Sequence, residues 1–466
     1  MKVIADNIRK VAYCLFSLLV ILFIYLSYIQ VVESNFLATH PLNRRNAEAI
    51  HQIEYGMVVD KNGQKLAYSE RDGDGFKRQY PYGAITAHVV GYDSETYGKT
   101  GIESTFNAYL TGKNNQLQHL GAISHLWTNQ VGNNVVLTLD AKLQEVAYKS
   151  LGDHRGAVVV MSPRTGAILA MVSKPSFNPN TLNEQWNHIS TATDSPLLNR
   201  SVQGLYPPGS IMKVMIADGA LTEQVIDQKR TINSEGFLKV PPDYVLEEVN
   251  RKVYGKINIK EALTVSSNVF FGTLGLELGG KRLAKTFERY GFKRPVSPEL
   301  QEAMSRLPDF NALGNGDLAQ VGIGQSSLLV TPLRMAMLAS SFANKGKIMK
   351  PYIVSTITDD KGSKVQEFAP EEWLTVTTPQ LADTIKEMMV EVVSHGTGNA
   401  ASLRGVQVAG KTGTAENPHG DSHAWFIGFA PADNPEVAIA VIVENGGGGG
   451  SIAAPIARQI LEKALH

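Results

Sequence analysis

One uninterrupted apolar segment near the N-terminus constrains the topology of this chain more than any other feature. Residues 11–32 contain 22 positions without a charged side chain, and a helix of that length spans about 33 Å, enough to cross a bilayer. Lys2, Arg9 and Lys10 precede the segment and Glu33 follows it. Because cytoplasmic flanks are rich in lysine and arginine, the sequence predicts a single-pass anchor in the cell membrane, with a cytoplasmic N-terminus and the rest of the chain extracytoplasmic. The alternative, a cleaved signal peptide, is disfavoured because no A-x-A site follows within ten residues.

The overall composition excludes several classes of function. The chain has 466 residues, of which 43% are hydrophobic, so it can build a substantial core in two or three domains. Its formal net charge is +0, whereas nucleic-acid-binding domains usually carry a basic excess, so no nucleic-acid partner is expected. The single cysteine, Cys14, excludes a disulfide within the chain and any cysteine-based zinc site. No H-E-x-x-H motif occurs among the 11 histidines, and we expect neither a metal nor another cofactor.

The chain beyond the anchor divides into two regions. Residues 33–152 contain short apolar runs separated by turn sequences such as DKNGQ, which is typical of a small β-rich module. Two strands around a Pro-Arg-Thr-Gly turn at 156–173 mark the start of the second region, 153–466. Helical spacing of apolar residues predicts helices in this region at 212–224, 258–278, 332–344, 378–394 and 452–465. The expected fold class is α+β, with a transmembrane helix, a β-rich module and a large C-terminal domain.

The stretch GVQVAGKT at 405–412 matches the phosphate-binding pattern G-x-x-x-x-G-K-[ST], which raises nucleotide binding as one interpretation. A phosphate loop needs flexible residues between its glycines and a helix directly after the lysine, because backbone N–H groups and the helix N-terminus hold the phosphates. Here Val406, Gln407 and Val408 alternate like a strand, and glycine and proline follow closely. The sequence therefore favours a strand that carries Lys411 over a nucleotide site.

The stretch YPPGSIMKVM at 206–215 holds the main candidate for a nucleophile. Ser210 precedes Lys213 by three positions, and the Pro-Pro-Gly before the serine predicts that an apolar helix begins there. Residues i and i+3 of a helix lie on one face, which brings the lysine amine near the hydroxyl. A buried lysine whose pKa is lowered toward neutrality can serve as the base that a serine nucleophile needs. The alternative is an ordinary helix N-cap serine beside a surface lysine.

Two further motifs follow in order along the chain. A serine-x-asparagine motif lies at 266–268 and a lysine-threonine-glycine motif at 411–413. Matches to the same short patterns at 176–178 and 99–101 both precede Ser210, so they cannot complete the ordered set. The order serine-x-x-lysine, serine-x-asparagine, lysine-threonine-glycine is the signature shared by penicillin-binding proteins and serine β-lactamases.

The chain resembles a class B penicillin-binding protein, a monofunctional peptidoglycan D,D-transpeptidase, over nearly its whole length. No glycosyltransferase domain precedes the β-rich module, unlike the bifunctional class A type, and the resemblance is to short members without C-terminal repeats. It implies a pedestal-like, dimerisation-like module followed by a transpeptidase domain with a central antiparallel sheet flanked by helices. Segments outside the motifs that resemble the family are NRR (43–45), YGMVVDKNGQKLA (55–67), GKTGIES (98–104), NVVLTLDAKLQ (134–144), GIGQSSLLVTPLRMA (322–336), MMVEVVSHGTGNAA (388–401) and AWFIGFAP (424–431).

The resemblance implies a mechanism for the motif residues. Ser210 would attack the peptide bond of a D-Ala-D-Ala stem peptide and form an acyl-enzyme, with Lys213 as its base. Ser266 and Asn268 would bridge the two lysines, pass a proton to the leaving amine and hold the substrate amide. Lys411 would lower the pKa of Lys213 and attract the terminal carboxylate.

The resemblance also implies how the third motif binds substrate. Thr412 and Thr414 would donate their hydroxyls to the carboxylate, and Gly413 would leave room for the acyl chain. The backbone N–H groups of Ser210 and Thr414 would form the oxyanion hole.

His423 has no visible partner in the sequence and is expected to be an exposed loop residue.

The resemblance also suggests partners and rival functions. Expected partners are peptidoglycan stem peptides, β-lactam antibiotics and a membrane glycan polymerase of the shape, elongation, division and sporulation family. A class A β-lactamase would need a deacylating glutamate, and between Asn268 and Lys411 no glutamate has asparagine four positions later. A D,D-carboxypeptidase differs only in the nucleophile that resolves the acyl-enzyme. A non-catalytic scaffold of the cell-wall machinery is the remaining alternative.

Overall fold

The structure is a computed structural model, and it describes residues 2–31, 33, 53–112, 131–418 and 420–466. The chain forms two units, Met1–Glu54 with Glu70–Lys77 and Tyr55–Ser69 with Arg78–His466. In the first unit, α1 (Lys2–Val31) includes the segment Asp6–Gln30, which is long and apolar enough to cross a membrane. The NRR sequence at 43–45 lies outside the described residues.

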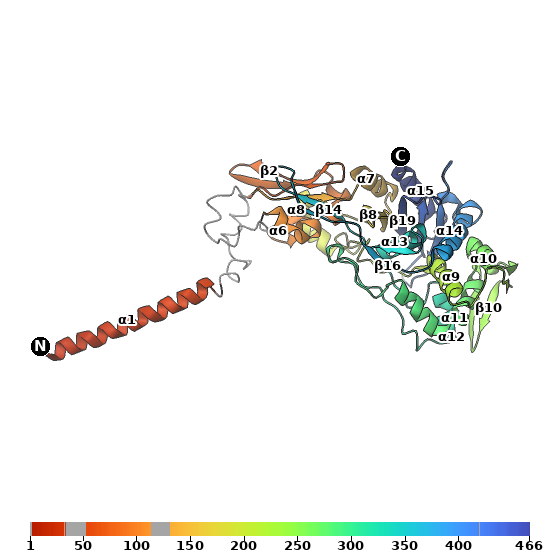
Figure 1. The fold of residues 1–466 in the computed structure, drawn as a ribbon, viewed down its shortest axis with the longest axis horizontal. Coiled ribbons are helices and arrows are strands. Elements are labelled where there is room, and N and C mark those ends of the chain that lie inside the picture. The colour runs from red at the N-terminus through yellow and green to blue at the C-terminus, as the bar shows by residue number, and fades with distance from the viewer. Residues whose placement is uncertain (1, 32, 34–52, 113–130, 419) are drawn as a thin grey trace. The chain divides into compact units, whose positions relative to one another are not determined.

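An antiparallel five-stranded sheet forms the centre of the second unit, with the order β17-β18-β19-β7-β8. Every residue of β19 is buried, because helices cover both faces of the sheet. α13 packs on one face, and α7 and α15 pack on the other (Figure 1). The predicted hairpin at 156–173 and the predicted α+β fold are confirmed. The bounds are β7 Gly156–Met161, β8 Ile168–Lys174, β17 Ala409–Ala415, β18 His423–Ala430, β19 Val437–Val443, α7 Ala141–Ser150, α13 Pro332–Ala343 and α15 Ala453–Ala464.

One predicted helix, 258–278, is in fact two. α10 (Ile259–Val265) begins with a capping box at Asn258 and ends at Ser266, whose backbone is left-handed with φ 60°. α11 (Asn268–Arg289) then begins with Ser267 as its N-cap. Apolar residues recur at helical spacing on both sides of this turn, so the pattern alone did not reveal the break.

The predicted helix at 212–224 begins with one turn of 3-10 helix. That turn, η4 (Gly209–Met212), contains Ser210. The α-helix α9 (Lys213–Thr222) starts only at the lysine. Residues three apart are eclipsed in a 3-10 turn, so Ser210 and Lys213 still share a side of the segment.

A second sheet draws on residues far apart in the sequence. Its six strands have the order β15-β14-β6-β1-β2-β3. β6 pairs in parallel with β1 and antiparallel with β14, so two strands from beyond residue 350 complete a sheet that starts in the N-terminal region. The bounds are β1 Val58–Val59, β2 Lys65–Asp72, β3 Gly75–Gln79, β6 Asn134–Leu137, β14 Val354–Thr358 and β15 Lys364–Glu367.

Candidate active site

Ser210 is held against the edge strand β17 by the residue before it. Gly209 has φ 56°, and a Cβ there would lie 2.8 Å from the carbonyl oxygen of Thr414 and 3.0 Å from Cβ of Ala415. Its N–H donates to the carbonyl oxygen of Gly324 over 2.8 Å. Only glycine combines this backbone conformation with such a close approach. The turn that carries the serine therefore packs directly on the strand that carries the third motif.

Lys213, three residues after the serine, is fully buried and contacts the second motif. Its Nζ donates to the carbonyl oxygen of Ser266 over 2.7 Å and to Oδ1 of Asn268 over 2.8 Å. Burial lowers the pKa of this amine to about 7, although the negative charge of Glu248 opposes the shift. Among the described residues, no hydrogen bond joins this amine to the hydroxyl of Ser210. Catalytic contacts are often loose before substrate binds, so this does not argue against a base role.

Ser266 links the two motif lysines. Nζ of Lys411 donates to Oγ of Ser266 over 2.9 Å, and Nζ of Lys213 lies 3.4 Å from the same oxygen. Lys411 also donates to the carbonyl oxygen of Thr412 over 2.9 Å. Burial, followed by the positive charge of Lys213, holds the pKa of Lys411 well below its usual value. The left-handed turn at Ser266 is what aims its hydroxyl between the two amines.

The contacts of Lys213 suit a neutral amine. A neutral lysine has two N–H donors and one lone pair, and the two nearer acceptors are the carbonyl oxygen of Ser266 and Oδ1 of Asn268, with Oγ of Ser266 farther away at 3.4 Å. In the neutral form both hydrogens can serve the two nearer acceptors, which leaves the lone pair to accept a proton. This arrangement can perform general-base chemistry if an acidic hydroxyl proton comes within reach.

The third motif lies within a strand. Lys411 is fully buried inside β17, which continues to Ala415, so no helix N-terminus follows the lysine to hold a phosphate. The two early matches to the short motifs have other contacts: Lys99 pairs with Asp93, and the Ser176 hydroxyl donates to the carbonyl oxygen of Ala84. Lys411 therefore lies on a strand, as expected, although the alternating residues 406–408 precede that strand.

Gly413 has a packing role in the structure. A Cβ at this position would lie 3.0 Å from Cγ2 of Ile211 and 3.2 Å from the carbonyl oxygen of Pro208. The glycine therefore allows the turn before Lys213 to lie close to β17, and the room for an acyl chain that the resemblance implies stays a prediction. Thr412 and Thr414, on either side of it, line the cleft.

The candidate residues converge on one cleft with a volume of about 720 Å³. Five of the eight line it directly: Ser210, Ser266, Asn268, Thr412 and Thr414. Lys213 and Lys411 lie buried behind its wall. The glycines at 448–450 form another part of the lining. In the part of the chain that is described, no group of three or more His, Cys, Asp or Glu side chains is placed to hold a metal ion.

Two residues of the cleft were missed from the sequence. Thr397 contacts Thr412 hydroxyl to hydroxyl over 2.6 Å, from the loop that follows α14 (Pro379–Ser394). Glu248 is buried beside the second motif, with 4% of its surface exposed. Neither belongs to a short motif, although Thr397 falls in the MMVEVVSHGTGNAA segment that resembles the family. A single sequence gives no signal for Glu248, because its partners lie 14 residues upstream and 19 to 21 residues downstream.

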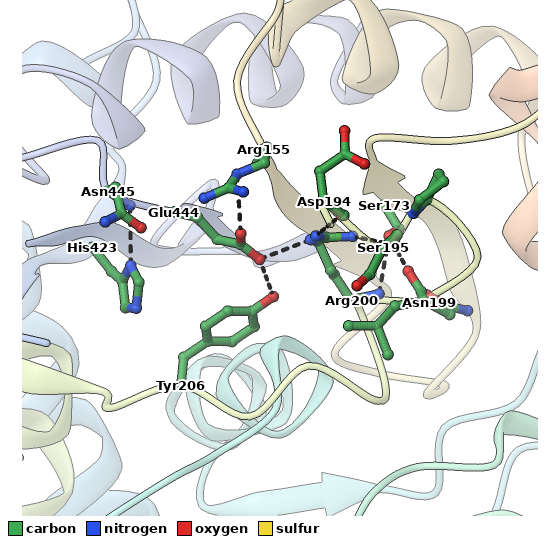
Figure 2. Close-up of polar contacts among 12 residues, drawn as sticks. Arg155, Ser173, Asp194, Ser195, Asn199, Arg200, Tyr206, His423, Glu444 and Asn445 are labelled. Atoms are coloured by element: carbon green, nitrogen blue, oxygen red, sulfur yellow. Dashed lines mark hydrogen bonds and ion pairs between the residues drawn. The ribbon is translucent and has the colours of Figure 1, made fainter. Parts of the chain in front are cut away.

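A buried polar network supports the segment before Ser210. Oε1 of Glu444 accepts from Nε of Arg200 and from the hydroxyl of Tyr206, both over 2.7 Å. Figure 2 shows Glu444 between these groups and Arg155, whose Nε lies 3.5 Å from Oε2. The ring of Tyr206 packs edge-on against Trp425, whose indole N–H donates to the carbonyl oxygen of Pro207. These contacts therefore fix the segment before Ser210 to the central sheet.

The expectation for His423 was wrong. The residue is the first of β18 and is buried, not exposed in a loop. Its Nδ1 accepts the backbone N–H of Asn445 over 3.0 Å, and its ring packs edge-on against Tyr206 (Figure 2). Burial lowers its pKa. The sequence gave no partner for this side chain because Asn445 lies on the far side of the β18–β19 hairpin.

Comparison with known proteins gives the family. Residues 156–462 match the penicillin binding protein transpeptidase domain, and residues 56–135 match the penicillin binding protein A dimerisation domain. The peptidoglycan D,D-transpeptidase PbpA of Mycolicibacterium smegmatis is 33% identical over an alignment that covers 99% of each chain. The peptidoglycan D,D-transpeptidase MrdA of Acinetobacter baumannii is also 33% identical, over 83% of this chain and 65% of that one.

A solved structure agrees with these matches. Penicillin-binding protein A from M. tuberculosis, in a ceftriaxone acyl-enzyme complex, superposes with a TM-score of 0.84 and 31% identity, covering 89% of this chain and 99% of that one. The match extends over both the β-rich module and the domain with the motif cleft. The chain therefore belongs to the penicillin-binding proteins of class B.

Proposed function

We propose that this chain is a peptidoglycan D,D-transpeptidase that cross-links stem peptides through a serine acyl-enzyme. One observation carries the proposal: the hydroxyl of Ser266 lies between the buried amines of Lys213 and Lys411, on the wall of the cleft that contains Ser210. The M. smegmatis and A. baumannii relatives, both named peptidoglycan D,D-transpeptidases, support the same reaction.

The reaction needs an activated serine and a route for its proton. Oγ of Ser210 attacks the carbonyl carbon of the penultimate D-alanine, and its proton passes to the lone pair of Lys213. The proton then reaches the leaving amine through Ser266, and terminal D-alanine departs. Asn268 orients Lys213 and offers its amide to the substrate. An amine from a neighbouring strand attacks the ester and restores the serine.

The third motif recognises the end of the stem peptide. Lys411 supplies positive charge for the terminal carboxylate, and Thr412 and Thr414 offer hydroxyl donors. Thr397 holds the hydroxyl of Thr412 in position. The N–H groups of Ser210 and Thr414 stabilise the tetrahedral oxyanion, an interaction worth roughly 10² to 10³ in rate per donor.

Labelling with fluorescent penicillin tests this proposal. The β-lactam carbonyl takes the place of the D-Ala-D-Ala peptide bond, so Ser210 acquires a stable covalent label. Ser210→Ala should abolish the label, and Ser402→Ala, which changes an exposed serine, should leave it intact. Label that persists in Ser210→Ala would contradict the nucleophile assignment, and a wild type that takes no label would favour a non-catalytic scaffold.

Product analysis separates transpeptidation from D,D-carboxypeptidase activity. Both reactions release D-alanine from the same acyl-enzyme, and they differ in whether an amine or water resolves it. Incubation with a stem peptide and an acceptor amine should give cross-linked dimer. D-alanine release without dimer would favour the carboxypeptidase.

The proposal extends to topology and to a partner. The charge flanking Asp6–Gln30 supports a cytoplasmic N-terminus and an extracytoplasmic catalytic domain. We propose that the chain acts beside a membrane glycan polymerase of the shape, elongation, division and sporulation family, which supplies the glycan strands. Protease added to intact spheroplasts should digest the region beyond residue 33, and co-purification in detergent should recover the polymerase. Protection from protease would contradict this topology.

A further inference from the structure

The buried carboxylate of Glu248 has no role in the mechanism described so far. It follows β11 (Tyr244–Glu247) and borders the cleft. It takes part in no ion pair within the described residues, which is unusual for a carboxylate with 4% of its surface exposed. Its contacts therefore call for a functional or structural reason.

Four neutral donors converge on this carboxylate. Oε1 accepts from the hydroxyls of Ser234, over 2.9 Å, and of Ser267. Backbone N–H groups supply the other two: Val269 to Oε1 over 3.1 Å and Asn268 to Oε2 over 2.7 Å. An ionised carboxylate is an acceptor only and can take four such bonds, so the arrangement matches the charged form.

These contacts fix the first turn of α11. The leading N–H groups of a helix have no partner within the helix and favour a negative charge. Here Glu248 takes those of Asn268 and Val269, and Ser267 accepts the next one, from Phe270, over 3.1 Å. Ser267 in turn donates to Glu248. The carboxylate thus sets the start of the helix that carries Asn268.

The orientation of Asn268 is controlled from the same place. Its Nδ2 donates to the carbonyl oxygen of Glu247 over 2.9 Å, which leaves Oδ1 to face Lys213. Asn268 is therefore bound twice: its side-chain amide donates to the carbonyl oxygen of Glu247, and its backbone N–H donates to the carboxylate of Glu248. A shift of this turn would move Ser266 and Asn268 away from both lysines.

The charge of Glu248 also acts on Lys213. Within the described residues, two charged side chains act on this amine, Glu248 from beyond β11 and Lys411 from β17, and the centroid of the Phe271 ring lies 5.7 Å from its Nζ. Glu248 opposes the effect of burial on the Lys213 pKa. Charged groups on the helices around α9 form ion pairs with one another: Asp218 with Arg289, Lys260 with Glu391, and Lys285 with Glu223.

We propose that Glu248 is a positioning residue for the acylation of Ser210. Glu248 anchors the serine-x-asparagine turn and supplies the negative charge opposite Lys213. This inference rests on the proposed function. Its hydrogen bonds within the described residues are with Ser234, Ser267, Asn268 and Val269, so it acts on the reaction through the positions of Ser266, Asn268 and Lys213.

The test is the pH dependence of acylation by fluorescent penicillin in Glu248→Gln, measured as the acylation constant and the binding constant separately. A displacement of about 1 Å in a catalytic group costs roughly 10²-fold, so the acylation constant should fall by about that factor, with little change in binding. Loss of the negative charge should also move the rising limb of the pH profile to lower pH. Damage to the fold alone would not produce such a shift.

Matched variants complete the experiment. Glu235→Gln makes the same substitution at an exposed neighbouring carboxylate and should keep the wild-type rate and midpoint. Ser267→Ala removes one link but keeps the charge, so it should slow acylation without moving the midpoint. If Glu248→Gln fails to fold, Ser267→Ala carries the test at a temperature well below its own unfolding midpoint, and an unchanged rate there overturns the proposal.

The outcomes separate this inference from the proposed function. A wild type without Ser210-dependent label would overturn both. If the label depends on Ser210, two results would overturn the role of Glu248 alone. One is an acylation constant of Glu248→Gln within about threefold of wild type, and the other is an unmoved midpoint of its pH profile.

Discussion

Nζ of Lys213 donates to Oδ1 of Asn268 over 2.8 Å, and no corresponding hydrogen bond joins it to Ser210 among the described residues. The base of the proposed reaction is therefore held by the second motif, although Ser210 lies only three residues before it in the chain. These contacts hold the amine in place before substrate arrives. Both the reactivity and the stability of the protein should depend on the protonation of this amine.

Acylation of Ser210 should become faster as the pH rises through about 7. Only neutral Lys213 can accept the serine proton, and burial brings its pKa to about 7. Lys213→Ala should lower the acylation constant by about 10² to 10⁴. Time-resolved penicillin labelling between pH 5.5 and 9 measures both effects, with exposed Lys229→Ala as the control. A flat profile in the wild type would show that another group is the base.

Burial of Lys213 should cost stability at neutral pH, and the cost should shrink in alkali. The folded-state pKa of the amine lies below its unfolded value, so the unfolded chain binds more protons between these values and stability rises with pH across that window. Lys213→Met removes this dependence. Compared with the variant, the wild type should therefore gain unfolding temperature from pH 7 to pH 9. Parallel curves for the two proteins would contradict a buried, titrating amine.

Gly209→Ala should slow acylation sharply. The new Cβ would press on the carbonyl oxygen of Thr414, and the left-handed backbone adds strain of about 1 to 3 kcal/mol. Gly405→Ala is the matched control, since Gly405 also has positive φ but nothing lies within 4 Å of its Cβ position. Calorimetry should show a stability loss in both variants, whereas penicillin labelling should fail only in Gly209→Ala. Equal labelling of the two would mean that the approach to β17 does not position Ser210.

The two arginines on Glu444 should differ in their importance. Arg200 has 4% of its side chain exposed and Arg155 has 47%. Removing a buried partner leaves an uncompensated charge, so Arg200→Met should lower the free energy of unfolding by about 3 to 5 kcal/mol. Arg155→Met should cost about 0 to 1 kcal/mol. Denaturant unfolding compares them, and similar losses would contradict a network anchored by Arg200.

Thr397→Val should weaken ligand binding more than chemistry. The substitution keeps the shape of the side chain but removes the hydroxyl that contacts Thr412. The net value of such a hydrogen bond, about 0.5 to 1.5 kcal/mol, predicts up to roughly tenfold weaker binding of β-lactams. Thr384→Val, on α14, is the control, because this hydroxyl donates to the carbonyl oxygen of Gln380 in its own helix. Concentration-dependent labelling rates separate binding from acylation, and a change in acylation alone would argue against this role.

Much of the site follows from local sequence. The rest depends on contacts between residues that are far apart in the sequence. Ser210 and Lys213 are close because they are three residues apart. A strand carrying Lys411 was expected from the alternation at residues 406–408, but those residues precede β17, which begins at Ala409. The break at Ser266 was missed because the apolar spacing runs through it. Glu248 and His423 depend on partners that only folding brings near, so nothing beside them in the sequence predicted their burial.

The pairing of β6 with β14 has a consequence for biogenesis. Because a chain is made from its N-terminus to its C-terminus, Asn134–Leu137 emerges long before Val354–Thr358. During that interval one edge of β6 has no strand beside it, and unpaired edges promote aggregation. The six-stranded sheet therefore cannot be completed until more than two hundred residues after β6 have been made. A fragment cut between the two regions would retain the same open edge permanently, so the two halves of this protein should be produced together.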